Sequence, residues 1–162
     1  MANNLRLLAR EIRLVELEAL EAVALAIIAE AQRILASEGK LATKQLINGM
    51  GYTLNKRLRR VRVFNKKPYA TIVEFGRRPG GKFPPPSQIK TWLAAKGLPA
   101  TDQVAYLVGR RIAEKGIAPI RFLSRAFAIA PTEIDRHMRG ALGAWLAAHR
   151  TNQRQRRIPF VF

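Results

Sequence analysis

The N-terminal part of the chain carries a helical pattern of apolar residues. Between Leu5 and Leu35 these residues recur in alternating steps of three and four, which predicts one long amphipathic helix. Its apolar positions are Leu5, Leu8, Ile12, Val15, Ala19, Ala22, Ala26 and Ala29. Because alanine lets a neighbouring backbone approach closely, the helix either packs on a sheet of its own chain or forms a coiled-coil contact between subunits.

A strand pattern follows the helix. Arg60, Val61, Arg62 and Val63 alternate between charged and apolar side chains, as in a half-buried strand with one charged face. We expect a small antiparallel sheet built around residues 41–75. Arginines on one strand face are typical of a surface for a polyanion and also of an exposed edge protected against aggregation, so both interpretations remain open.

Residues 68–76, with the sequence PYATIVEFG, allow two local structures. Pro68 at the first position and Gly76 beyond the end favour a short helix. The β-branched run from Thr71 to Val73 favours a strand instead, and the choice stays open. Residues 77–86 contain four prolines and two glycines, which predicts a loop.

Three helices are predicted after this loop. The first runs from Gln88 to Lys96 behind a Ser87 cap, and Gly97 ends it. The second starts at a Thr101 or Asp102 cap and ends at Gly116, and the third spans residues 121–149 with an interruption near Pro131. The chain is therefore predicted to be α+β, with the long N-terminal helix and the C-terminal helices packed on the sheet. We expect one domain over residues 1–150 and an extended, basic and apolar C-terminal arm over residues 151–162.

Charge changes this picture, because the 162 residues carry a net charge of +18. Residues 1–40 hold 5 basic and 6 acidic residues, so the whole excess lies in residues 41–162. Such a field attracts polyanions, chiefly nucleic acid, although a solvated basic surface is the simpler interpretation. The residues predicted to face DNA are Lys56, Arg57, Arg59, Arg60, Arg62, Lys66, Lys67, Arg77, Arg78 and Lys82.

The residues that enzymes and metal sites need are scarce. The chain has no cysteine, and its two histidines, His137 and His149, lie about 18 Å apart if one helix carries both. No phosphate-binding loop motif is present. We therefore expect no enzyme, with no catalytic, metal-binding or cofactor-binding residues. The uncharged run from Ala22 to Ala29 is too short to span a bilayer, so we expect a soluble protein without a membrane partner.

Glu74 is unusual because it lies among apolar residues in a strongly basic part of the chain. Burying a carboxylate is costly unless a partner compensates its charge. We favour a pairing of Glu74 with an arginine, either buried or at an interface, and the alternative is an exposed carboxylate.

Three sequence segments occur in this order along the chain: PYATIVEFGRRPGG, PPPSQIKTWLAAKGL and AYLVGRRIAEKGIAPIRFLSRAF. This order and spacing resemble the tail-completion or neck family of long-tailed phages, over about 60 of 162 residues. The residues that match the family are Tyr69, Ala70, Val73, Glu74, Phe75, Gly76, Ile89, Trp92, Lys96, Gly97, Ile112, Gly116, Pro119, Phe122, Leu123 and Ala126.

The resemblance implies a structural virion protein that completes the tail and joins it to the head. In such a neck a homo-oligomer, a hexameric ring, surrounds the DNA channel between a head-closure or connector protein and a tail terminator or tail tube protein. It implies assembly in the host cytoplasm, location in the neck of the virion, non-specific contact with genomic DNA in the lumen, and no cofactor. The candidate subunit or partner contacts are Glu74, Ile158, Phe160 and Phe162, the last three by adding to a neighbour's sheet edge.

Two other classes of protein remain as alternatives. A tail terminator or a head-closure protein also forms a ring in the same part of the virion. A free-standing, non-specific nucleic-acid-binding protein fits the charge, although no known reader motif is present.

Overall fold

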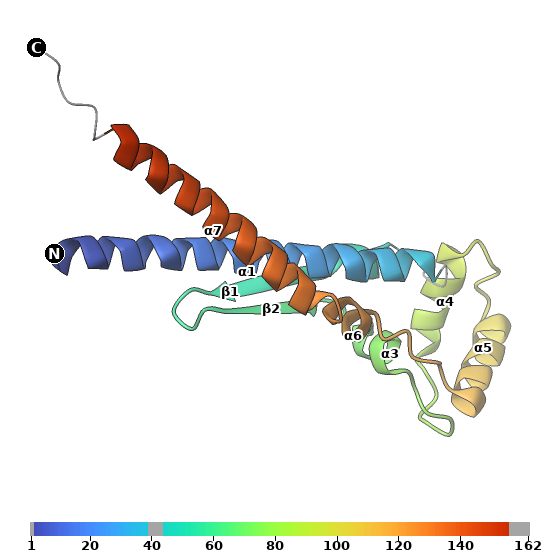
Figure 1. The fold of residues 1–162 in the computed structure, drawn as a ribbon. Coiled ribbons are helices and arrows are strands. Elements are labelled where there is room, and N and C mark those ends of the chain that lie inside the picture. Colours follow the sequence, from blue (N-terminus) through green and yellow to red (C-terminus); the bar gives the residue numbers. More distant parts are fainter. Residues whose placement is uncertain (1, 39–43, 156–162) are drawn as a thin grey trace, which may run out of the picture. The chain divides into compact units, whose positions relative to one another are not determined.

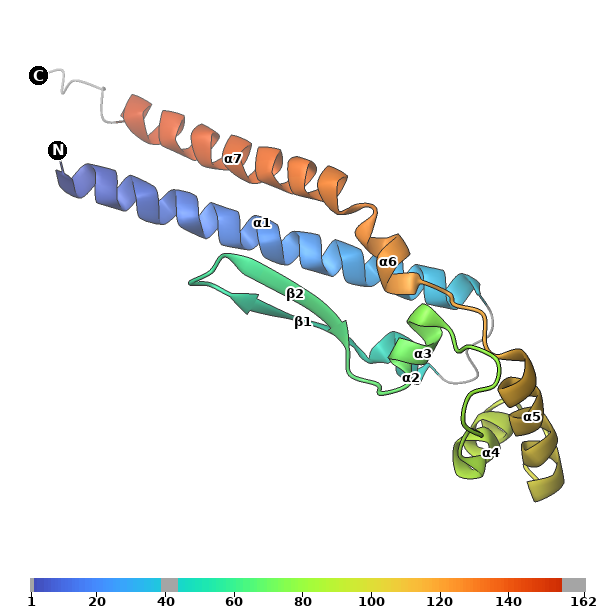
Figure 2. The same cartoon turned by 90° about the horizontal axis from the view of Figure 1, so that it is seen from below.

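The computed structural model describes residues 2–38 and 44–155, and it confirms a mixed fold of helices with a two-stranded antiparallel sheet (Figure 1). In chain order the elements are α1 (Ala2–Ser37), α2 (Gln45–Asn48), β1 (Met50–Asn55), β2 (Arg60–Asn65), α3 (Ala70–Phe75), α4 (Pro86–Ala95), α5 (Asp102–Lys115), α6 (Phe122–Phe127) and α7 (Ala130–Gln155). The predicted sheet around residues 41–75 is thus a hairpin, whose strands lie side by side in Figure 2.

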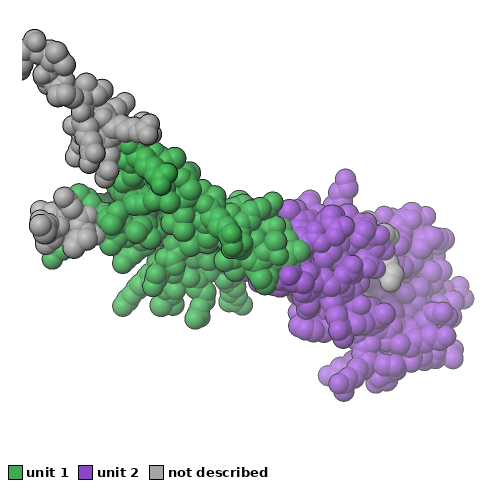
Figure 3. Space-filling model, in the orientation of Figure 1, with its two compact units in different colours: residues 1–26, 52–62, 129–162 green, residues 27–51, 63–128 purple. Residues whose placement is uncertain are grey.

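The chain divides into two compact units, which are coloured separately in Figure 3. Unit 1 consists of residues 1–26, 52–62 and 129–162, and unit 2 consists of residues 27–51 and 63–128. Helix α1 and the hairpin each contribute residues to both units. The expectation of one domain over residues 1–150 stays a prediction.

Unit 1 joins the first part of α1 to the outer half of the hairpin and to α7 through polar contacts. Tyr52 on β1 donates a hydrogen bond to Glu21, and Arg59 in the hairpin turn pairs with Glu16 at 3.1 Å. From α7, Trp145 Nε1 donates to a Glu11 carboxylate oxygen at 3.2 Å. Three residues of α1, namely Ala19, Val23 and Ala24, are buried in this unit.

Unit 2 contains most of the buried side chains. Gln32 on α1 donates to the Ile47 carbonyl at 3.0 Å, and Asn65 at the end of β2 donates to the Leu46 carbonyl at 2.7 Å. Helices α4 and α5 pack on each other through Ile89, Leu93 and Ala105. The largest fully buried side chains of unit 2 are Phe122, Ile27, Leu35, Leu46 and Leu93.

The buried face of α1 differs from the predicted one. Its buried positions are Ala19, Val23, Ala24, Ile27, Ala31, Ile34 and Leu35, whereas Leu8 and Ile12 of the predicted stripe are exposed. The difference arises because the larger side chains in the second half of the helix, such as Ile27 and Leu35, define the core. The predicted stripe instead runs through Ala22, Ala26 and Ala29, which are half-buried or exposed.

Most helix boundaries follow the expected caps. Thr101 accepts a hydrogen bond from the Val104 N–H at 3.3 Å, and Gly116 ends α5 with a φ of 73°. The Ser87 cap is wrong, because α4 begins at Pro86, whose fixed φ and missing N–H suit a first helical position. Residues 70–75 form the short helix α3, which favours the helical alternative for this segment over the strand.

The third predicted helix is interrupted, as expected, and forms α6 and α7. Helix α7 contains Pro131 in its first turn, where no N–H is needed. It continues to Gln155, so residues 151–155 of the predicted arm are helical. The remainder of the arm, residues 156–162, lies outside the described residues.

Candidate functional site

The buried carboxylate of Glu74 organises the middle of unit 2. Its side chain is 4% exposed and accepts hydrogen bonds from the Leu123 N–H at 2.8 Å and the Ser124 N–H at 2.9 Å. The Ser124 hydroxyl donates a third bond at 2.5 Å. These donors belong to the first turn of α6, where main-chain N–H groups have no partner inside the helix. Glu74 therefore acts as a cap supplied from a distant part of the chain.

Among the described residues Glu74 is bonded to main-chain N–H groups and a hydroxyl, so the predicted buried pairing with an arginine of the same chain is wrong, while a pairing at an interface stays a prediction. The free N–H groups and the dipole of a helix start compensate a carboxylate without a buried guanidinium, which would bring its own desolvation cost. The nearby Arg125 on α6 pairs with Glu38 at 2.9 Å instead. Glu74 was also predicted to contact a neighbouring subunit, and in this chain its carboxylate is bonded to residues of α6.

Two glycines allow α3 and the end of α5 to join their following segments. Arg77 and Ile117 form an antiparallel bridge, with each N–H donating to the other carbonyl at 2.9 Å. A Cβ on Gly116 would lie 2.2 Å from the Arg77 carbonyl oxygen, and one on Gly76 would lie 2.6 Å from the Ile117 oxygen. Both glycines also have positive φ, so a side chain at either position would be disfavoured by the backbone conformation as well as by the steric clash.

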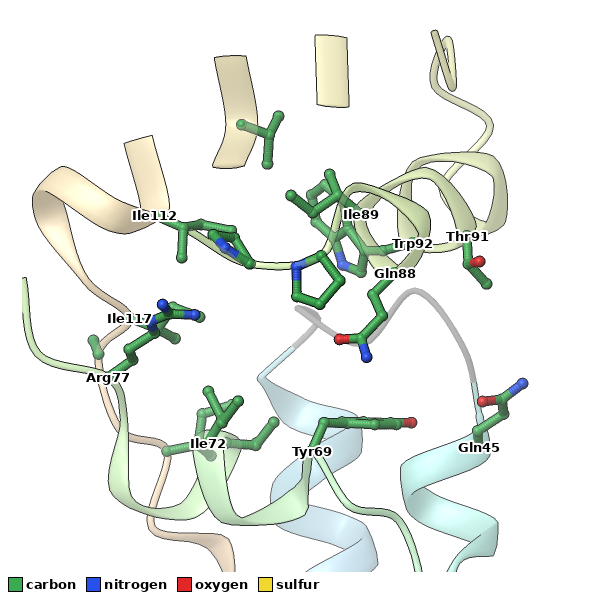
Figure 4. Close-up of a pocket in the computed structure, with 16 residues that line it drawn as sticks. Gln45, Tyr69, Ile72, Arg77, Gln88, Ile89, Thr91, Trp92, Ile112 and Ile117 are labelled. Atoms are coloured by element: carbon green, nitrogen blue, oxygen red, sulfur yellow. The ribbon is translucent and has the colours of Figure 1, made fainter. Parts of the chain in front are cut away.

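This junction forms one wall of an apolar pocket of about 660 Å³ in unit 2 (Figure 4). Its main apolar lining residues are Tyr69, Ile72, Ile89, Trp92, Ile112 and Ile117. Polar groups are few, and they include Gln45, Arg77, Gln88 and Thr91. The sequence pattern did not indicate the pocket, because its walls come from four separate segments that only the fold brings together. The exposed Trp92 on α4 is the one signal that a sequence reader could have used.

Five of the ten basic residues predicted to face DNA lie in the part of the hairpin that belongs to unit 1. They are Lys56, Arg57, Arg59, Arg60 and Arg62, and all are exposed. On β2 the predicted alternation is present, since Arg60 and Arg62 are exposed, whereas Val61 is half-buried and Val63 is buried. Arg59 differs from the others because Glu16 neutralises its charge.

The other five predicted residues, Lys66, Lys67, Arg77, Arg78 and Lys82, lie in unit 2. Lys66, Arg78 and Lys82 are exposed, whereas Lys67 and Arg77 are half-buried. Arg77 is held by its main-chain bridge to Ile117 and lines the pocket. The structure thus divides the predicted polyanion surface between two units.

Helix α1 presents a row of exposed leucines that the predicted apolar stripe does not include. Leu7, Leu14 and Leu25 are 57%, 52% and 52% exposed. Seven residues make about two helical turns and eighteen make about five, so the three side chains project from one face. The buried Val23 and Ile27 lie on the opposite side of the helix, which leaves the leucine row without a covering core.

Some ionisable groups of unit 1 and unit 2 are perturbed by a close partner. The hydrogen bond that Tyr52 donates to Glu21 raises the pKa of the phenol, and desolvation adds to the effect. In unit 2 the hydrogen bond from Arg33 lowers the pKa of the Glu30 carboxyl. Tyr52 and Glu21 both lie in unit 1, and Glu30 and Arg33 both lie on α1 in unit 2. None of these four residues lines the pocket.

The described part of the chain offers no group of three or more metal-ligating side chains. His137 lies 3.3 Å from Glu133 on α7, and His149 lies 2.9 Å from Glu11. Within the described ranges no helix is long and apolar enough to cross a membrane. The candidate contacts Ile158, Phe160 and Phe162 lie outside the described residues.

Comparison with family models, with curated proteins and with solved structures finds no match to this chain.

Proposed function

We propose that this chain is a structural virion protein of a tailed phage, which completes the tail and joins it to the head as a ring around the DNA channel. The first support for this proposal is the set of three sequence segments that resemble the tail-completion family. In unit 2, Glu74 of the first of these sequence segments accepts hydrogen bonds from Leu123 and Ser124 of the third segment. The antiparallel bridge between Arg77 and Ile117 joins the same two segments.

The observation that carries the proposal is the leucine row of α1. A ring requires each subunit to offer a surface to its neighbour, and a row of large, exposed apolar side chains on one helix face suits that use. Leu7, Leu14 and Leu25 provide such a row. The neighbour would cover them with a different surface, because ring contacts are heterologous.

The basic residues of the hairpin support the DNA channel. Lys56, Arg57, Arg60 and Arg62 are exposed and close together in sequence around one turn. A spread of positive charge holds phosphates without reading bases, which suits a lumen through which any sequence must pass.

The assembly state of the purified full chain tests the proposal. We expect light scattering to report a closed oligomer and negative-stain microscopy to show rings. Leu14→Glu should prevent ring formation, because it places a charge in the subunit contact. Leu107→Glu is the control, since Leu107 is comparably exposed but lies on α5 of unit 2. Rings that form equally well with Leu14→Glu would contradict the assigned contact.

A second candidate function is non-specific binding of nucleic acid by a free-standing protein, which the exposed basic hairpin favours. A chain that stays monomeric at every concentration and coats DNA without tail proteins supports this candidate. Binding to isolated tails or to filled heads supports the neck proposal, and the end that is bound distinguishes tail completion from a terminator or head-closure role.

A further inference from the structure

The apolar pocket of unit 2 leaves large side chains open to solvent. Ile72, Trp92 and Ile117 line it and are exposed, although each could bury much of its surface under a ligand. Figure 4 shows Tyr69 and Ile72 on one side of the space, with Ile89 and Trp92 on the other. A cavity of about 660 Å³ is in the size range of sites that bury a compact ligand.

Prolines and a main-chain bridge restrict the backbone on two sides of the pocket. Pro84 and Pro85 restrict the backbone on the side where α4 begins. The bridge between Arg77 and Ile117 fixes the opposite side, and Gly116 keeps that junction closed to side chains. A preformed pocket loses little conformational entropy on binding.

The chemistry of the lining restricts the ligand. None of the residues that line the pocket is acidic, and the one fully cationic group is Arg77. Such a lining gives no partner to a cationic side chain, so the inserted part of the ligand should be mainly apolar and carry no positive charge. Tyr69 and Trp92 give the lining two aromatic side chains, as in the aromatic-lined grooves that accept extended, proline-containing peptides.

We infer that the pocket binds residues 158–162 of a neighbouring copy of this chain. The side chains of this segment, Ile-Pro-Phe-Val-Phe, are all apolar and uncharged, and the segment contains a proline. Seven residues follow the last described residue, Gln155, and the basic Arg156 and Arg157 separate α7 from the apolar segment. The assignment to a neighbour rests on the proposed ring, and it gives that ring a second contact in addition to the α1 leucines.

Disulfide trapping tests the inference, because the natural chain has no cysteine. One full-length variant carries Gln88→Cys, at a polar position of the pocket, and a second carries Phe160→Cys. After mild oxidation of the mixture, we expect a covalent dimer of the two variants. The matched control replaces Gln88→Cys by Gln103→Cys, an exposed position on α5 outside the pocket lining. Docking should raise the yield about tenfold over the control, because it raises the effective concentration of the thiols.

A competing peptide distinguishes a cross-link that depends on docking from one that forms by random collision. A peptide of residues 154–162 with blocked ends should suppress the dimer, whereas the same peptide with serine in place of both phenylalanines should not. A yield equal to that of the control, or one that the first peptide does not reduce, overturns the inference. An intrachain product of the Gln88→Cys/Phe160→Cys double variant, without dimer from the mixture, overturns the assignment to a neighbour.

The trapping experiment is independent of the ring experiment. Rings that form without trapping above the control overturn the pocket assignment and leave the proposed function standing. Trapping of a dimer by a chain that never forms rings supports the pocket assignment and contradicts the proposed ring.

Discussion

The carboxylate of Glu74 accepts hydrogen bonds from both the main-chain N–H and the hydroxyl of Ser124, at 2.9 and 2.5 Å. The two residues are 50 positions apart in the chain. This contact joins α3 to the first turn of α6, and the main chain reinforces it because the Arg121 N–H donates to the Glu74 carbonyl at 3.2 Å. The capping of α6 thus depends on a residue of another helix.

Glu74→Gln should lower the free energy of unfolding by about 1–3 kcal/mol, because the amide NH₂ group cannot accept the bonds that the second carboxylate oxygen accepts. Urea unfolding measures the change, followed by fluorescence in a Trp145→Phe background so that the signal comes from Trp92 of the same unit. Glu114→Gln is the control, since Glu114 forms an exposed pair with Arg110 and its loss should cost no more than about 0.5 kcal/mol. Equal effects of the two substitutions would contradict the capping role.

Gly116→Ala should destabilise unit 2 more than Gly97→Ala. Both glycines have positive φ, 73° and 67°, so a side chain at either position strains the backbone. Only at Gly116 would the new Cβ meet the backbone, at 2.2 Å from the Arg77 oxygen, whereas no atom lies within 4 Å at Gly97. The difference between the two variants in urea unfolding measures the clash together with the stricter backbone conformation of Gly116, whose ψ is -164°. A difference near zero would show that the bridge between Arg77 and Ile117 can move apart without cost.

Local features of this fold could be predicted from sequence, and contacts between distant segments could not. The alternation of Arg60 to Val63 and the stop at Gly116 depend on neighbouring residues, and both were predicted correctly. The partner of Glu74 was not, because its donors are main-chain groups of α6, which no side-chain pattern marks. The exposed Leu14 was missed for a related reason, since the second half of α1 determines which face is buried.

Tyr52 should ionise at a higher pH than an ordinary tyrosine, because its hydrogen bond to Glu21 and its desolvation raise the pKa of the phenol. A raised pKa in the folded state means that this contribution to stability is complete below the unfolded pKa and is lost as the pH rises through the folded pKa. Ultraviolet difference absorbance measures the titration, and Tyr52→Phe assigns the signal among the three tyrosines. Glu21→Gln should return the pKa toward its usual value; an unchanged titration curve would show that Glu21 does not cause the shift.

The basic hairpin should bind duplex DNA without sequence preference and with strong dependence on salt. Each phosphate contact contributes about 0.9 to the slope of the logarithm of the binding constant against the logarithm of salt concentration. Arg60→Ala/Arg62→Ala should therefore reduce that slope by about 2, as measured by fluorescence anisotropy over a series of salt concentrations. Arg110→Ala/Arg111→Ala removes two exposed arginines from α5 with the same change in net charge, and it should leave the slope nearly unchanged. Equal slopes for the two double variants would mean that total charge, rather than the hairpin, holds the DNA. Affinity that survives high salt or prefers one sequence would exclude the role of a passive channel lining.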